Sequence, residues 1–444
     1  VMERRRSKSR PIATSAGSGE PPPYPPPQAG EGSIDGAGRP FAADGARFGG
    51  ALAQFLESLP SRPRVLGIGE PMHGVEAFPR LRNQASQHLV EHDRYRSIAI
   101  ETDCLAAVTV DAFVAGEKPG YLDEVMRSGF SHGFEKAEAN RELVAWMREY
   151  NRSRDAGDRL RFYGFDAPME MTHADSPRPA LTALRTYLAT SLEATLLPAT
   201  AGGIDSLAGA DERWSNPAAI LVPTESVGAS DEATKLRLLA DDLVALLIAE
   251  SPRLIASTSR DEWWRAWLHG RTAAGLLRYH AAMADTCDSR IGRLPGLRDV
   301  MMADNINAIL TREGRRGPTL MFGHNLHLQK GRSKWHLGEL SLEWWSAGAI
   351  IGAQLGDQYA VAATALGVAP HQGLNAPAPD TLEGTLASLP ERGYVFTSES
   401  LTAALRGIAP NLVLRTDTAP NNGYFPLDPR HVNEADGVIF LKGA

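Results

Sequence analysis

Four short apolar runs, each followed at once by ionisable residues, constrain the fold of this chain more than any other feature of the sequence. The runs cover Val65–Gly69, Ser97–Ile100, Leu160–Phe165 and Thr319–Phe322. Runs of this length, bounded by polar residues, are typical of buried strands. Amphipathic helical patterns lie between them, for example over Phe78–Glu91. We therefore predict an α/β fold, with a mostly parallel sheet flanked by helices.

The rest of the chain divides into segments of different composition. Residues 1–44 combine a basic stretch, a proline-rich run and glycines, and are predicted to be a disordered leader. The α/β core is expected in two parts, 45–174 and 316–444. Residues 175–315 are rich in Leu, Ala and Arg at helical spacing, which predicts a large helical insertion or lid. Further strands of the core are predicted at Ala347–Ile351, Tyr359–Ala365, Tyr394–Phe396 and Val438–Leu441.

The ends of the predicted strands carry the candidate site. The ionisable residues that follow the first four strands are, in chain order, Glu70, His73, Glu101, Asp166, His324 and His327. Right-handed crossovers keep the carboxyl ends of parallel strands at one edge of the sheet, and ligands bind beyond that edge. We therefore expect these side chains to converge.

Such a cluster suits acid–base chemistry. A histidine near two carboxylates has a stabilised imidazolium, so it can take a proton from water. A second histidine, or Arg82 on the following helix, can stabilise the oxyanion that forms when water attacks an ester. Each residue alone has a structural alternative, as a helix cap, a hydrogen-bonded histidine or a salt-bridge partner. The convergence of several such residues favours a functional site.

Charge and cysteine content exclude several classes of protein. A net charge of -7 gives no general attraction to nucleic acid or anionic membranes. Two cysteines, Cys104 and Cys287, form no disulfide framework and fit a reducing compartment such as the cytoplasm. No apolar run has the length of a membrane span, and no apolar segment follows the basic N-terminus as a secretory signal requires. The expected partner is a small-molecule substrate, and the oligomeric state stays open.

Two further patterns offer different chemistry. Gly129-Phe-Ser-His-Gly133 matches the G-x-S-x-G nucleophile elbow, but the residues before it predict a helix where that motif needs a strand. The histidines and glutamates of the candidate site could bind a divalent metal, since imidazole and carboxylate suit zinc or manganese. The sequence lacks the H-E-x-x-H zinc motif, and we expect no required metal or other cofactor.

Three blocks of sequence carry a resemblance to a known family. They are Gly67-Ile-Gly-Glu-Pro-Met-His-Gly74 with the following Phe78-Pro-Arg-Leu-Arg82, then Ile98-Ala-Ile-Glu101, and Phe322-Gly-His-Asn-Leu-His327. Together they resemble the erythromycin esterase family, which also includes proteins of succinoglycan biosynthesis. Weaker likeness runs through Tyr163–Asp166 and Arg298-Asp299, and the region 195–260 shows none.

The resemblance implies hydrolysis of a macrolide lactone or similar ester by water that a histidine activates. In this chain the base would be His73, and the catalytic set would be completed by Glu70, Arg82, Glu101, His324 and His327. The residues expected to contact substrate are Asp166, Ser131, His132, Met72 and Phe322. Met72 and Phe322-Gly323 depart from the Thr and Trp-Ala usual in the family, which alters the pocket wall and keeps the ionisable set. The same site could instead serve an elimination, a cyclisation or an acyl transfer, or belong to a binding protein without turnover.

Overall fold

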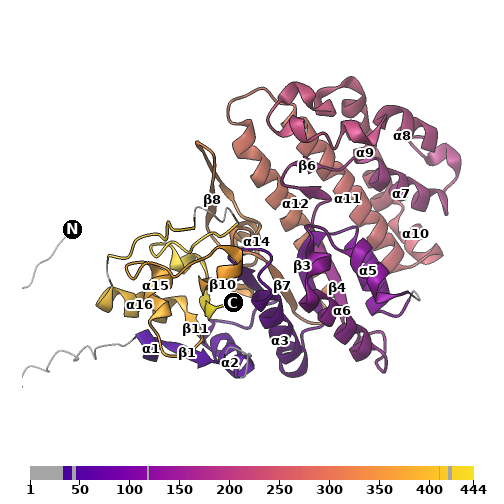
Figure 1. Cartoon of the computed structure of the whole chain (residues 1–444). Coiled ribbons are helices and arrows are strands. Elements are labelled where there is room, and N and C mark those ends of the chain that lie inside the picture. The colour runs from indigo at the N-terminus through magenta and orange to yellow at the C-terminus, as the bar shows by residue number, and fades with distance from the viewer. Residues whose placement is uncertain (1–33, 43–46, 118–119, 410, 419–422) are drawn as a thin grey trace, which may run out of the picture.

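An eight-stranded, mostly parallel sheet forms the centre of the protein (Figure 1). The computed structural model describes residues 34–42, 47–117, 120–409, 411–418 and 423–444. The strand order is β1-β11-β12-β10-β2-β7-β3-β4; the six strands from β12 to β4 run parallel, and β11 and β1 add antiparallel pairs at one end. The strands are β1 (Gly38–Phe41), β2 (Val65–Glu70), β3 (Ser97–Asp103), β4 (Arg161–Asp166), β7 (Thr319–His324), β10 (Tyr359–Val368), β11 (Gly393–Thr397) and β12 (Gly437–Gly443). The predicted fold class is confirmed.

Helices cover both faces of the sheet. Alternate residues of each central strand point to opposite faces, so each strand packs against helices on both sides. Leu66 and Ile68 of β2 pack into one hydrophobic core, whereas Val65 packs into another. The helices of the first core are α2 (Phe48–Ser58), α3 (Ala77–His92), α4 (Ala107–Val114) and α6 (Glu138–Asn151), and those of the second include α12 (Arg290–Glu313) and α14 (Ala347–Leu355). Burial on both sides explains the near-continuous apolar runs that predicted the strands.

A group of helices lies beside the end of the sheet where β3 and β4 run (Figure 1). Its members are α7 (Arg178–Ala189), α8 (Ala201–Ala208), α9 (Asp231–Ala249), α10 (Ser251–Ser257) and α11 (Arg260–Met283). They share a core of their own, built on leucines such as Leu184, Leu236 and Leu243. Helix α12 differs, because Met302 and Ile306 pack in the core of the sheet. Although 175–315 was expected as one insertion, α12 is therefore also part of the layer that covers the sheet.

Two small antiparallel sheets flank the carboxyl ends of the central strands. One pairs β5 (Met169–Glu170) with β6 (His173–Ala174), and the other is the hairpin of β8 (Arg332–Leu337) and β9 (Leu340–Trp345). The remaining helices are α1 (Ile34–Ala37), α5 (Leu122–Gly129), α13 (Asn325–Leu328), α15 (Leu382–Ala387) and α16 (Ser398–Ile408). The sequence patterns did not predict either hairpin.

Two expectations about the fold are wrong. The expected leader 1–44 includes β1, whose four residues pair with β11, so the folded part already contains residues 34–41; residues 1–33 and 43–44 lie outside the described residues. The run Ala347–Ile351 was predicted as a strand and forms the start of α14. The Ser346 hydroxyl accepts the backbone N–H of Ala349 and caps this helix. A short apolar run cannot distinguish a buried helix from a strand, and the cap decides here.

The register of the sheet brings the ends of β2, β3 and β7 close together. Gly69 pairs with Gly323, and Glu70 pairs with His324. A Cβ on Gly69 would lie 2.1 Å from Asn325 Oδ1, and one on Gly323 would lie 2.9 Å from Glu101 Oε2. The two glycines are therefore needed for close approach rather than for backbone conformation. The close approach of these three strand ends places carboxylates and histidines from distant parts of the chain at one edge of the sheet.

Candidate active site

His73 lies at the opening of the cluster, above a buried carboxylate. Its side chain is 40% exposed, whereas that of Glu70 is 3% exposed. His73 Nδ1 lies 2.8 Å from Glu70 Oε1. Burial lowers the pKa of His73, but the charge of Glu101 and the bond to Glu70 raise it by more, so the net pKa lies above 6.5. The ring edge also meets Phe134, with centroids 5.1 Å apart.

Glu101 places one carboxylate oxygen among three basic side chains. Its Oε1 lies 3.7 Å from His73 Nε2, 3.4 Å from His327 Nε2 and 3.7 Å from Arg298 Nη2. The other oxygen accepts the backbone N–H of His324 at 2.6 Å. Burial raises the pKa of Glu101, but His327, His73 and Arg298 together lower it to about 2. The surrounding positive charge therefore favours the ionised form of Glu101.

His324 is a neutral, internally bonded histidine. Its Nδ1 accepts the backbone N–H of Leu326 at 3.1 Å, and its Nε2 donates to the carbonyl oxygen of Pro71 at 3.2 Å. Burial lowers the pKa of His324 to about 3. Both ring nitrogens are thus engaged within the protein, and the ring packs edge-on against His73 and Phe425. These contacts suit a residue that shapes the site better than one that stabilises an oxyanion.

His327 forms a second histidine–carboxylate pair. Its Nδ1 lies 2.5 Å from Asp299 Oδ1, and Asp299 is completely buried on α12. Burial lowers the pKa of His327, but Asp299 and Glu101 raise it by more, so the net pKa is raised. His73 and His327 thus approach the same oxygen of Glu101, each backed by its own carboxylate.

Asp166 and His132 form the third part of the cluster. Arg298 Nη2 donates to Asp166 Oδ2 at 2.5 Å and Nε to both carboxylate oxygens. His132 bridges Asp166 Oδ2, at 2.9 Å, and Glu170 Oε2, at 2.7 Å. Burial lowers the pKa of His132, but the two carboxylates raise it to about 9. His132 also has a left-handed φ of 60°, a strained conformation for a residue other than glycine.

Comparison with known families identifies the chain. The sequence model of the erythromycin esterase family matches residues 90–443. The chain belongs to the erythromycin esterase family. The match confirms the resemblance drawn from the three sequence blocks, and it begins after Glu70 and His73. Membership of this esterase family supports a hydrolase role.

Solved structures share the fold of this family member. A Bacillus cereus protein has a TM-score of 0.66 at 16% identity, over 92% of this chain and 95% of its own. A protein named for succinoglycan biosynthesis has a TM-score of 0.64 at 14% identity, over 93% and 95%. The erythromycin esterase EreC, in its open conformation with one histidine replaced by asparagine, has a TM-score of 0.60 at 15% identity, over 88% and 93%. At these identities the likeness shows the fold alone.

Arg82 lies near the cluster but bonds elsewhere. Its guanidinium donates to Asn83 Oδ1, Asn140 Oδ1 and the carbonyl oxygen of Ala139, and lies over the Phe322 ring at 4.9 Å. Burial lowers the pKa of Arg82 to about 9, against the opposing charge of Glu70. In this esterase family member the contacts of Arg82 join α3 to α6, whereas the sequence offered it, with His324 and His327, as a group that could stabilise an oxyanion.

Three residues that were predicted to contact substrate make other contacts in the structure. Met72 and Phe322 are 2% and 3% exposed and belong to the hydrophobic core beneath the cluster. Ser131 Oγ accepts the backbone N–H of Asp103 and bonds to Thr102 Oγ1, which holds the loop to the end of β3. Helix α5 precedes this serine, as expected for a chance match to the nucleophile elbow. His132 and Asp166, in contrast, lie in the cluster.

Sequence reasoning missed three residues that complete the site. Arg298 and Asp299 were noted only as a weak likeness, and Glu170 was not considered.

Within the described residues, no three His, Cys, Asp or Glu side chains are grouped so that they could hold a metal ion. The described part of the chain also has no helix long and apolar enough to cross a membrane.

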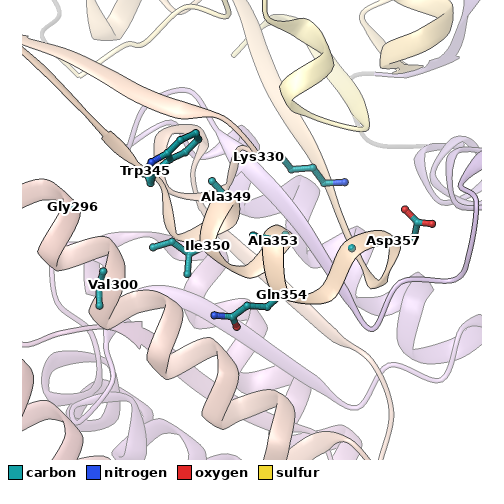
Figure 2. A pocket seen from close by; sticks show the side chains of 11 residues that line it. Gly296, Val300, Lys330, Trp345, Ala349, Ile350, Ala353, Gln354 and Asp357 are labelled. Carbon is teal, nitrogen blue, oxygen red and sulfur yellow. The ribbon is translucent and has the colours of Figure 1, made fainter.

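A groove of about 920 Å³ opens between α12 and α14 (Figure 2). Gly296 and Val300 of α12 line it, together with Trp345 and Ile350. A concave apolar surface of this size is an ordinary candidate for a ligand site. However, none of the predicted catalytic residues lines this groove. In this family member, therefore, the groove and the acid–base cluster are lined by different residues.

Proposed function

We propose that the chain is a hydrolase that opens a lactone or cleaves an ester in a large, mostly apolar substrate. The observation that carries the proposal is the placement of His73. Glu70 holds its Nδ1, its ring reaches the opening of the cluster, and its Nε2 lies 3.7 Å from Glu101 Oε1. A base must be oriented, accessible and close to a group that positions water, and His73 meets all three needs.

The tautomer of His73 follows from its partner. A carboxylate only accepts hydrogen bonds, so Nδ1–H donates to Glu70 and Nε2 carries the lone pair. A direct bond between Nε2 and Glu101 is too long at 3.7 Å, and this distance suits a bridging water. A water that donates one proton to Nε2 and the other to Glu101 directs its lone pairs outward. We propose that this water attacks the carbonyl carbon and that His327 or Arg298 faces the developing oxyanion.

Isotope transfer from water tests the proposal. The protein is incubated in oxygen-18 water with macrolide lactones and simple esters, with and without chelator. Macrolides enter the panel because a structural relative is named an erythromycin esterase. We expect opened lactones that are heavier by one water, and carboxylic acids from the simple esters, each carrying one oxygen-18, with equal rates in both arms. A loss of activity in chelator would establish a metal requirement, and unlabelled products would overturn hydrolysis.

A second candidate keeps the site and changes the reaction. One structural relative is named for succinoglycan biosynthesis, and a histidine–carboxylate cluster can also promote an elimination, a cyclisation or an acyl transfer to a hydroxyl. These reactions add no water to the product. The product mass in the same experiment therefore distinguishes them from hydrolysis.

The rate should rise with pH through a pKa above 6.5. His73 acts as a base only when it is neutral, and Glu101 and Glu70 raise its pKa by more than burial lowers it. We expect kcat/KM between pH 5 and 9 to show a rising limb with its midpoint above 6.5. Glu101→Gln removes the largest favourable charge, so the midpoint should move to lower pH even though the rate also falls. A midpoint that does not move would show that another group titrates.

A further inference from the structure

We infer that His327 donates the proton to the leaving alcohol oxygen, and that Asp299 and Trp344 are the positioning residues that make it an acid. The inference rests on the proposed hydrolytic function and deepens it. It divides the cluster into a base, His73, and an acid, His327, on either side of the Glu101 carboxylate.

Asp299 uses both of its oxygens, and the partners determine its orientation. Oδ1 lies 2.5 Å from His327 Nδ1. Oδ2 accepts the Trp344 indole N–H at 2.7 Å and the backbone N–H of Ala347 at 3.2 Å. Two fixed donors on Oδ2 leave Oδ1 turned toward the histidine. Because a carboxylate has only acceptors, His327 must present Nδ1–H, and any second proton is on Nε2.

The β8–β9 hairpin braces this arrangement from both strands. Trp344 lies near the end of β9 and is 7% exposed. Ser333 of β8 donates to the carbonyl oxygen of Leu326, the residue before His327, and accepts from the side chain of Gln329. The backbone that carries His327 and the carboxylate that orients it are thus both tied to one hairpin.

The Nε2 atom of His327 faces the shared carboxylate without a strong bond to it. The distance to Glu101 Oε1 is 3.4 Å, long for an N–H···O bond, so the proton remains free for a substrate oxygen. His73 Nε2 lies 3.7 Å from the same oxygen. The two other histidines of the cluster cannot serve, because His324 has both nitrogens bonded internally and His132 has both bonded to Asp166 and Glu170.

These two histidines account for every proton that moves during the reaction. Water adds to the carbonyl carbon while His73 takes one of its protons. The carbon–oxygen bond to the alcohol then breaks, the carbonyl re-forms, and the Nε2 proton of His327 moves to the departing alkoxide. His73 releases its proton to solvent, His327 regains one from solvent, and the carboxylic acid product ionises. One ester bond and one water are consumed.

Asp299→Asn should disable the acid while it preserves the shape. Asparagine has a single acceptor oxygen, which the Trp344 and Ala347 donors would hold, so its amide NH₂ would face His327. Nδ1 would then have to accept, and the lost negative charge would lower the pKa of His327. Trp344→Phe is the milder variant, because it keeps a ring of similar shape and removes the N–H. Trp335→Phe is the matched control, since Trp335 lies on β8 of the same hairpin and is only partly buried.

Two esters of the same carboxylic acid distinguish proton donation by His327 from the other steps of the reaction. A p-nitrophenolate leaves without a proton, whereas an ethoxide needs one. We expect Asp299→Asn to slow the ethyl ester about 100-fold or more, in the range for general acid catalysis, and to change the p-nitrophenyl ester several-fold at most. Trp344→Phe should show the same preference more weakly, and Trp335→Phe should match the wild type. Equal slowing of both esters would overturn the acid role of His327.

Nitrogen-15 NMR of histidine-labelled protein gives a readout that does not depend on turnover. We expect His327, identified by the signal lost in His327→Gln, to keep Nδ1 protonated in the wild type and to change tautomer in Asp299→Asn. An unchanged tautomer and pKa would overturn the positioning role. A wild type that cleaves neither these esters nor the macrolide lactones would contradict the proposed function instead, and the NMR result would still decide whether Asp299 positions His327.

Discussion

Replacement of His73 by alanine is expected to lower kcat/KM by a factor of about 10²–10⁴ or more, the range for a general base. The loss has two causes. The lone pair that takes the proton from water disappears, and Glu70 loses the partner that opposes its burial. Burial holds the pKa of Glu70 above its usual value even though the bond to His73 opposes it, so this pKa should rise further without His73. Initial rates on a substrate of the wild type give the measurement.

The fold should survive this change, because the His73 side chain is 40% exposed at the opening of the cluster. His92→Ala is the matched control, since His92 is 62% exposed at the end of α3. Thermal unfolding should show similar midpoints for both variants, and only His73→Ala should lose activity. A His73→Ala protein with a near-normal rate would remove His73 from the mechanism.

The central strands could be predicted because helices bury both of their faces. Val65–Gly69 and Thr319–Phe322 are therefore nearly continuous apolar runs in the sequence. The edge strand β1 lacks this signal: it has four residues, includes Pro40 and pairs with β11 alone. Proline is tolerated at such an edge because one side of the strand needs no donor. A rule based on apolar runs therefore finds the centre of the sheet and misses the edge strand β1.

The convergence of the site followed from topology alone, because Glu70 and His324 end neighbouring parallel strands. The roles within the site depend on contacts that sequence does not encode. His324 and His327 are three residues apart, yet one is internally bonded and neutral and the other is paired with a buried carboxylate. Arg82 shows the same limit, since the sequence places it near the site but not its hydrogen bonds.

Asp299 could have been found from a different signal. It occupies the same stripe of α12 as Met302, Ile306 and Ile309, all of which are buried. A charged residue at a core-facing position of an amphipathic helix is rare, because burial of an unpaired charge is costly. Such a residue therefore indicates a partner elsewhere in the chain. In this protein the partner is His327, at a predicted strand end.

Replacement of Arg298 by methionine is expected to destabilise the protein by about 3–5 kcal/mol, the cost of breaking a buried ion pair by removal of one partner. Arg298 is 12% exposed and faces both Asp166 and Glu101. Burial raises the pKa of Asp166, and Arg298 is the largest of the groups that hold it below its usual range. Methionine fits α12 about as well as arginine does, so helix propensity should contribute little. Urea unfolding at pH 7 gives the measurement.

The pH dependence separates this effect from lost packing. In the wild type the lowered pKa values of Asp166 and Glu101 contribute stability above the unfolded values near 4, and this contribution is lost as the pH falls toward 2. Without Arg298 the two carboxyl groups can protonate in the folded state. The difference in the free energy of unfolding between variant and wild type should therefore be largest at pH 7 and shrink below pH 4. Arg293→Met, at an exposed position of the same helix, should change stability by at most about 0.5 kcal/mol. A deficit in Arg298→Met that stays constant with pH would assign the loss to packing, and Arg298 would not be the charge that keeps the carboxylates of this site ionised.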